Sequence, residues 1–270
     1  MTLFAATLVL AASAGAAPGF VVAIDPGHGG PFPHEGAHGP RRLYEKNVTL
    51  AIARELAHII EGDLGGRAVL TRAGDVDVAL AERPAIANAQ NADFLISIHC
   101  NSMPTTSDRR STRGIETYSL SPDPTDAQAR VLADRENADP AQPAATKRDP
   151  VQAILEDLAV NQAHVDSTAL AAALQRRLIR ATHAPSRGVR QAPFIVLAGA
   201  RMPAALVEVG FISHPAEGRR LAQPHYQRLL AQAIADGIAD FRKEAAEQRE
   251  AHGPAAPTAA ARGAAAPSVQ

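Results

Sequence analysis

Short apolar, β-branched segments alternate with segments of helical periodicity along most of the chain. A strand that is apolar on both faces is typical of a sheet covered by helices on both sides, because neither face of such a strand suits water. The alternation therefore predicts an α/β fold. The expected strands are 20–25, 67–71, 93–99, 114–120, 194–197 and 205–209, and the expected helices are 46–61, 78–91, 166–183 and 225–243.

The charge balance and the cysteine content narrow the possible functions. The 270 residues include 27 basic and 28 acidic side chains, without the excess of basic charge that nucleic-acid binding requires, so we expect no nucleic-acid partner. The single cysteine, Cys100, excludes an intramolecular disulfide and a thiolate metal cage. Because side chains alternate along a strand, we expect Cys100 to point away from its neighbour His99 and to act as a small buried hydrophobe, not as a nucleophile.

The two ends of the chain differ in composition from its centre. Residues 3–16 are all apolar or small and end in a small-x-small sequence. The run is too short to cross a bilayer, so we expect no membrane span and interpret residues 1–16 as a signal peptide, although no basic residue precedes the run. Its removal would leave a mature chain that begins near Ala17. Residues 248–270 are rich in Ala, Pro and Gly, which predicts a disordered tail after a domain at 17–247.

Residues 121–165 interrupt the alternation of strands and helices. Two segments with a helical pattern, 127–138 and 151–162, flank a polar centre that is rich in proline. Long insertions cost little loop entropy and are commonly functional. We therefore expect a helical insertion within the domain.

Three titratable side chains stand where expected strands end. His28 follows the first strand in the sequence DPGHGG, His99 ends the third, and Glu208 lies at the end of the last. In α/β sheets, ligand sites gather beyond the carboxyl ends of the strands. Glu45 begins the first expected helix and shares the apolar stripe with Ile52, so its carboxylate is expected to face inward, where a charge needs a partner or a metal ion.

Two imidazoles and one carboxylate form the protein ligands of a catalytic zinc site that keeps a fourth position open. His28, Glu45 and His99 are therefore candidate ligands of one Zn²⁺ ion, and Glu208 is the candidate general base for a water molecule. Their spacing matches no short HExxH signature, and cobalt or manganese could use the same ligands. Each residue taken alone also fits a structural role, as a hydrogen-bonded turn histidine or as a glutamate at a helix N-terminus.

Six motifs, in order along the chain, resemble the zinc-dependent N-acetylmuramoyl-L-alanine amidases: VVAIDPGHGG, LYEKNVTLAIA, DFLISIHCNS, RGIETYSLS, RGVRQAPFIVLAGARMPAALVEVGFISHP and the expected helix that follows it. The resemblance covers roughly residues 20–120 and 166–242. It implies a three-layer sandwich with a twisted mixed sheet flanked by helices. It also implies that the two histidines and Glu45 hold zinc, that Glu208 is the catalytic carboxylate, and that the substrate is the amide between N-acetylmuramic acid and L-alanine in peptidoglycan.

The insertion also has a counterpart in that family. Cell-division members carry a helical segment here that blocks the active site until an activator with a LytM-type domain displaces it. By this resemblance residues 121–165 are autoinhibitory, with Glu136 as the candidate inhibitory zinc contact and Glu156 as the second choice, although both also fit solvated helix charges. There are two departures from the family pattern, Cys100 in place of alanine and His214 in place of asparagine, and neither is expected to touch the candidate ligands.

The resemblance implies an exported, periplasmic enzyme that acts in daughter-cell separation. Three other functions remain open at this point. The chain could be a zinc peptidase that acts on free peptides, a wall-binding module that has lost its chemistry, or an interaction protein whose insertion is the main partner surface. Product analysis, binding without product release, and deletion of 121–165 distinguish these from an autoinhibited amidase.

Overall fold

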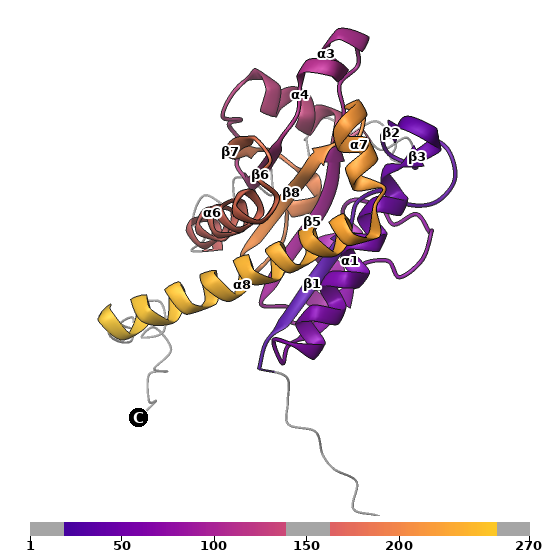
Figure 1. The fold of residues 1–270 in the computed structure, drawn as a ribbon. Helices are drawn as coiled ribbons and strands as arrows, with labels where there is room; N and C mark the ends of the chain where they lie inside the picture. Colours follow the sequence, from indigo (N-terminus) through magenta and orange to yellow (C-terminus); the bar gives the residue numbers. More distant parts are fainter. Residues whose placement is uncertain (1–18, 139–162, 253–270) are drawn as a thin grey trace, which may run out of the picture.

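A computed structural model describes residues 19–138 and 163–252 of the chain. Its centre is a mixed six-stranded sheet with the order β4-β1-β5-β8-β6-β7 (Figure 1). All neighbouring strands run parallel except β6 and β8, which are antiparallel. The strands are β1 (Val21–Pro26), β4 (Arg67–Leu70), β5 (Phe94–Asn101), β6 (Ile115–Leu120), β7 (Ser186–Ala192) and β8 (Ala204–Phe211), and a separate short pair joins β2 (His38–Gly39) to β3 (Leu43–Tyr44).

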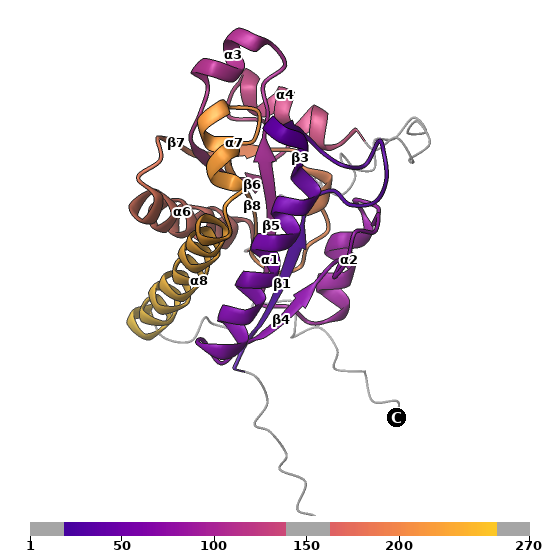
Figure 2. The same cartoon turned by 45° about the vertical axis from the view of Figure 1, so that its right-hand side comes forward.

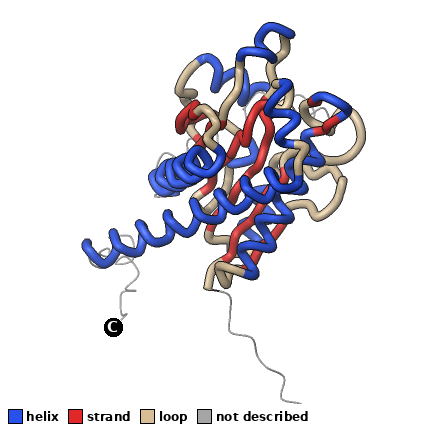
Figure 3. Tube along the Cα trace, in the orientation of Figure 1, coloured by secondary structure: helices blue, strands red, loops and turns tan. Residues whose placement is uncertain are grey.

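Helices cover both faces of this sheet, which appears as the strand layer between helices in Figure 3. Helices α1, α6 and α8 pack together over one face, and α2 lies on the other side (Figures 1 and 2). The helices are α1 (Glu45–Gly62), α2 (Glu82–Ala89), α3 (Thr106–Ser111), α4 (Ala127–Glu136), α6 (Ala163–Thr182), α7 (Pro215–Leu221) and α8 (Pro224–His252). None of the described helices is long and apolar enough to span a membrane.

Each face of the sheet has its own hydrophobic core, because successive side chains of a strand point to opposite faces. Ile96 and Ile98 of β5 belong to the core under α1, α6 and α8, whereas Leu95 belongs to the core on the other face. Both cores are well buried, which explains why the strands read as apolar throughout. The three-layer sandwich with a twisted mixed sheet is confirmed.

One predicted strand is wrong, one strand of the central sheet was missed, and the short pair of β2 and β3 was not predicted. Residues 194–197 form a buried 3₁₀ turn (Ile195–Leu197), not a strand. The strand lies just before it, at β7, whose sequence SRGVRQA is polar because β7 is the edge of the sheet and is half-exposed. A short apolar run does not distinguish a buried turn from a buried strand, and polarity hides an edge strand from a search for apolar segments.

The segments that depart from the α/β pattern are described only in part. Helix α4 confirms the first helical piece of the insertion, while the second piece, 151–162, lies outside the described residues together with Glu156. The expected signal peptide and residues 253–270 also lie outside them. Helix α8 continues to His252, so the first residues assigned to the tail are helical.

Candidate metal centre and active site

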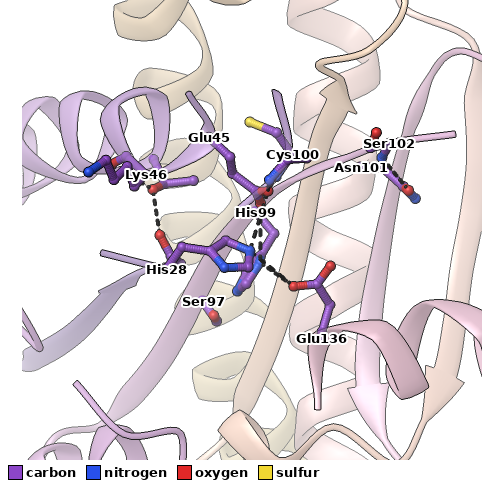
Figure 4. A network of polar contacts seen from close by, with 12 residues as sticks. His28, Glu45, Lys46, Ser97, His99, Cys100, Asn101, Ser102 and Glu136 are labelled. Carbon is purple, nitrogen blue, oxygen red and sulfur yellow. Dashed lines mark hydrogen bonds and ion pairs between the residues drawn. The ribbon is translucent and has the colours of Figure 1, made fainter. Parts of the chain in front are cut away.

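The fold brings His28, Glu45 and His99 together at the carboxyl ends of β1 and β5 (Figure 4). His28 follows β1, His99 lies in β5, and Glu45 is the first residue of α1. The Nε2 atom of His28 lies 3.3 Å from Oε2 of Glu45, and the Nδ1 atom of His99 lies 3.3 Å from Oε1 of the same carboxylate. The donor atoms of all three residues lie within 4.8 Å of one another, as the sequence predicted.

The donor atoms of this cluster fit a divalent cation. Nε2 of His28 and Nδ1 of His99 are buried and have no hydrogen-bond partner among the described residues. Buried polar atoms without partners are costly, and a bound metal ion would satisfy both. The carboxylate of Glu45 is fixed by backbone N–H groups of Ala37 and Cys100, which donate to it at 2.7 and 2.8 Å. Such outer hydrogen bonds orient a metal ligand.

The backbone around His28 has an unusual conformation. His28 has a φ of 59°, in the left-handed region that non-glycine residues rarely adopt, and two glycines with positive φ follow it. Gly36 also has to be a glycine, because a Cβ atom there would lie 2.5 Å from the His28 ring and 2.7 Å from Oε2 of Glu45. The chain at Gly36 therefore passes close to both candidate ligands. The loop that carries His28, residues 26–30, has to be held in place beside it.

Buried cationic side chains hold this loop through its carbonyl groups. Arg72 donates to the carbonyls of Pro26 and Gly27, both at 2.9 Å. Arg83 donates to the carbonyl of Pro26 at 3.1 Å and to Asp25 at 2.9 Å. These hydrogen bonds involve charged donors in a buried environment, where they are strong. Two arginines that were not predicted as site residues thus stabilise the conformation of residues 26–30, which we call the metal-ligand loop because it carries the candidate ligand His28.

Lys46 holds the far end of the same loop. Its ammonium group donates to the Gly30 carbonyl at 2.7 Å and to the carboxylate of Asp75 at 2.8 Å, and Asp75 in turn accepts the N–H of Gly30 at 2.8 Å. Lys46 directly follows the ligand Glu45 in α1. The first turn of α1 therefore supplies both a candidate ligand and a support for the loop that carries another.

Glu136, the last residue of α4, reaches into the candidate metal centre. Its Oε2 atom lies 3.1 Å from Nε2 of His28 and 3.2 Å from Nδ1 of His99, and it has no hydrogen-bond partner among the described residues (Figure 4). Burial alone would lower the pKa of His28, but the carboxylates of Glu45 and Glu136 raise it to about 9. Two carboxylates thus face the two imidazoles, and Glu136 occupies a fourth side of the candidate metal centre.

Glu208 lies in β8 beside His99 and is fully buried, with a relative exposure of 0%. Neither of its carboxylate oxygens has a hydrogen-bond partner among the described residues. Burial, reinforced by the nearby carboxylate of Glu136, raises the pKa of Glu208 well above its ordinary value. A buried carboxylate that is free of hydrogen bonds and takes up protons readily has the properties of a general base.

The site contains a second buried carboxylate, Glu116, that was not predicted. Glu116 of β6 pairs in register with Glu208 of β8. Its Oε1 accepts from Nδ2 of Asn101 at 2.6 Å, and its Oε2 accepts from Nε of Arg187 at 3.0 Å. Two features of the sequence point to these residues: Glu116 is a charge within an apolar strand, and Asn101 lies two positions after His99 and so on the same face.

The two departures from the family pattern have structural explanations. The side chain of Cys100 packs in the core under α1, as predicted, and burial raises its pKa well above the ordinary value. Contrary to expectation, Cys100 does touch a candidate ligand, but only through its backbone N–H on Glu45. Nδ1 of His214 accepts the N–H groups of Ala216 and Glu217 and caps α7, which is the role that an asparagine oxygen performs at a helix start.

A cavity of about 790 Å³ opens beside the metal centre. The candidate ligands His28, Glu45 and His99 line one side of it, and side chains of α4 line another. A concave site with convergent polar groups is where a ligand is expected to bind. Fold and site together define an α/β protein with a candidate metal centre and an adjacent buried carboxylate at the carboxyl ends of its strands.

Comparisons with known proteins identify the family within this class. The profile of a family described as N-acetylmuramoyl-L-alanine amidase matches residues 22–240. The chain is 34% identical to the amidase AmiA of Escherichia coli over 82% of this chain and 75% of AmiA. It is 36% identical to AmiC of Neisseria meningitidis over 81% of this chain, but spans only 51% of that AmiC.

Solved structures agree with this assignment. The amidase AmiC2 of Nostoc punctiforme is 30% identical and superposes with a TM-score of 0.61 over 84% of this chain and 99% of that structure. An amidase from Clostridium difficile is 26% identical, with a TM-score of 0.63 over 84% of this chain and 98% of the other. The chain belongs to the N-acetylmuramoyl-L-alanine amidase family.

Proposed function

We propose that this protein is a zinc-dependent amidase that cleaves the bond between N-acetylmuramic acid and L-alanine in peptidoglycan. Family membership supports the reaction. The observation that carries the proposal is the convergence of two unsatisfied imidazole nitrogens, from His28 and His99, on the carboxylate of Glu45 beside the free carboxylate of Glu208. A wall-binding module without chemistry would not need a buried, unpaired carboxylate in this place.

His28, Glu45 and His99 would hold one Zn²⁺ ion. When bound, zinc polarises an amide carbonyl and lowers the pKa of a water molecule to about 7. Glu208 accepts a proton from the attacking water, whose oxygen adds to the lactyl carbonyl carbon. Glu208 then returns the proton to the amide nitrogen as the carbon–nitrogen bond breaks. The products are a lactyl carboxylate and an intact stem peptide with a free L-alanine amine.

The proposal includes autoinhibition by α4. Glu136 fills the side of the metal centre that substrate and water need, and Arg135 fastens the end of the helix by donating to the Ser102 carbonyl at 2.8 Å. Asn137 adds a second attachment, since its amide donates to the Pro193 carbonyl at 2.7 Å and accepts from the N–H of Ile195 at 2.8 Å. An enzyme closed in this way needs a partner to open it.

By the same family resemblance, we propose that this partner is an activator with a LytM-type domain that binds the insertion at 121–165. The resemblance also supports an exported, periplasmic enzyme that separates daughter cells. Sequence similarity to AmiA and AmiC is the support for these points.

Dye release from labelled peptidoglycan sacculi tests the proposal on the full chain. We expect Glu136→Gln to raise hydrolysis about tenfold, because the block of the metal centre is weakened. Adding Glu208→Gln to this variant should lower the rate by about 10²- to 10⁴-fold. A chelator should abolish hydrolysis and zinc should restore it. Asp134→Asn, an exposed carboxylate on the same helix, is the matched control and should behave as the wild type.

Two results would contradict the proposal. Hydrolysis that survives Glu208→Gln would exclude the assigned general base. Products without a free L-alanine amine would indicate a peptidase instead of an amidase. If deletion of 121–165 leaves the rate unchanged, while Glu208→Gln does abolish hydrolysis and the products do carry a free L-alanine amine, the amidase stands and autoinhibition is wrong.

A further inference from the structure

Arg187 of β7 lies in the wall of the same cavity as the metal centre. Nε of its guanidinium donates to Oε2 of Glu116 at 3.0 Å, and its Cζ atom lies 5.2 Å from the ring centroid of Phe211. Its Nη1 group has no hydrogen-bond partner among the residues that the structure describes, and its side chain is 20% exposed. A guanidinium held on two sides with free donors is organised to bind a further oxygen ligand.

Helix α4 supplies oxygen acceptors to the arginines of β7. Oε1 of Gln128 accepts from Nη2 of Arg187 at 2.9 Å. The carboxylate of Asp126, at the start of α4, accepts from Nη1 of Arg190 at 2.9 Å. The same helix ends with the Glu136 carboxylate in the metal centre. Helix α4 therefore presents oxygen-bearing side chains at both ends of the cavity.

Displacement of α4 would leave positive charge uncompensated at β7. Within the described part of the chain, Glu116 is then the one remaining acidic partner of both arginines, at 3.0 Å from Arg187 and 3.5 Å from Arg190. Two guanidinium groups that share one carboxylate attract a second anion. The open cavity would thus combine a metal centre with a separate site for a negative group.

The distance between these two sites suits a peptide. Glu116 pairs in register with Glu208 of β8 on one side and with Gly188 of β7 on the other. Neighbouring strands lie about 4.8 Å apart, and the Arg187 guanidinium contacts Glu116 on the strand between β7 and β8, so it lies roughly 5 to 10 Å from the proposed general base. An extended peptide advances about 3.3 Å per residue, so a group at this distance belongs to the second or third residue after the scissile amide.

We propose that Arg187 recognises a free carboxylate in the stem peptide, two to three residues beyond the bond that is cleaved, with Arg190 in support. Helix α4 then inhibits as a mimic of the substrate, because it fills the metal centre with Glu136 and the arginine site with Gln128 and Asp126. This inference rests on the proposed amidase function and names the part of the substrate that determines its specificity.

Two synthetic N-acetylmuramoyl peptides test the inference. In one, the acidic residue that follows L-alanine keeps its free carboxylate, and in the other this group is a neutral carboxamide. We use the Glu136→Gln/Asn137→Ala variant as the released variant, because α4 loses its contacts with the metal centre and with Pro193 and Ile195. We expect its kcat/KM to be about tenfold higher for the free acid, as a charged hydrogen bond would give. Adding Arg187→Gln should remove this preference, mainly through a rise in KM for the free acid.

Two controls separate recognition from general damage. Arg180→Gln, an exposed arginine on α6, should leave the preference intact. Arg190→Gln should raise the basal rate of the otherwise unaltered chain, because Asp126 of α4 loses its partner, yet lower kcat/KM for the free acid in the released variant. A merely structural arginine would not produce effects of opposite sign.

The outcomes are distinguishable. Equal kcat/KM for both substrates in the released variant overturns the inference, whether or not Arg187→Gln folds. An equal loss on both substrates in Arg187→Gln, when the variant is folded, also overturns it. If the released variant cleaves neither substrate nor sacculi, the proposed function fails and this inference fails with it.

Discussion

Asp25 is a buried carboxylate that supports the metal-ligand loop without touching a ligand. It binds Arg83, which in turn donates to the loop carbonyl of Pro26. Burial alone would raise the pKa of Asp25, but the charge of Arg83 and hydrogen bonds from Ser97 and Thr71 outweigh burial and lower it. The carboxylate and its arginine thus form a buried pair in which each member depends on the other.

We expect a pH-dependent stability from Asp25. Because its pKa is lower in the folded protein than the value of about 3.9 in the unfolded chain, the ionised form stabilises the fold above about pH 4. This contribution is lost as the pH falls through the folded value. Asp25→Asn should therefore lower the free energy of unfolding by about 3 kcal/mol at pH 7, since it leaves Arg83 buried and unpaired, and by less at pH 3. Urea unfolding at both pH values measures the difference.

The control for this prediction is Asp93→Asn, which changes an exposed carboxylate at the start of β5. It should cost less than about 1 kcal/mol. If Asp25→Asn destabilised the protein equally at pH 7 and pH 3, ionisation of Asp25 would not contribute to the fold.

The sequence predicts a residue of the candidate site only where a chemically suitable side chain also stands at a position that the fold brings to the site. His28, His99 and Glu208 were found because titratable residues at strand ends share one edge of a sheet. Arg72 and Arg83 were not found, because their role depends on long-range contacts with loop carbonyls that no local pattern reveals. Spacing in the sequence does not report hydrogen bonds between distant segments.

At the scale of elements, α4 is attached to the domain by a short apolar face and by polar side chains near its ends. Leu132 and Ala133 pack in the core on its face of the sheet, but polar contacts of Arg135, Asn137 and Asp126 hold its termini. Such contacts exchange with water more easily than a buried apolar face does. The helix is thus suited to be released as a unit.

We expect Asn137→Ala to activate the enzyme. The substitution removes hydrogen bonds to Pro193 and Ile195, which are worth about 1 kcal/mol in total, so basal release of dye from sacculi should rise about fivefold. The chelator should still abolish this activity. Asp134→Asn on the same helix serves as the control, and an unchanged basal rate in Asn137→Ala would show that this attachment does not hold the closed state.

Elements were predicted well where one face is strongly apolar. The stripe of α1 gave its limits to within a residue, because Val48, Ile52, Leu56 and Ile59 all face the core. The strand β7 escaped because an edge strand can carry arginines, and the turn at Ile195–Leu197 was mistaken for a strand because it is buried. At the edge of a sheet a strand can be hydrogen-bonded without being buried. An apolar composition indicates burial only, so it does not reveal such a strand.

At the scale of the whole molecule, the candidate ligands join separate parts of the fold. His28 follows β1, Glu45 begins α1, and His99 lies in β5. A bound ion would therefore cross-link three elements, and an ion that binds only the folded chain stabilises it by mass action.

We expect metal removal to lower the thermal stability of the protein. At a free zinc concentration about 1,000 times Kd, binding contributes about 4 kcal/mol, so a chelator should lower Tm by roughly 10 °C. Calorimetry with and without chelator measures this shift. His99→Ala should unfold at the same temperature in both conditions, whereas Glu208→Gln should keep the shift. A wild-type Tm that chelator and zinc leave unchanged would argue against a zinc ion at this centre.

The position of β8 in the sheet has a consequence for the order in which activity is acquired. It is the last strand of the described chain, yet it lies between β5 and β6 and joins the two halves of the sheet. All three candidate ligands precede residue 100, so a partly synthesised chain already contains them, while Glu208 arrives with β8. An enzyme of this family built in this way gains its proposed general base only in the step that completes its sheet, so a partly folded chain lacks the residue that would activate water.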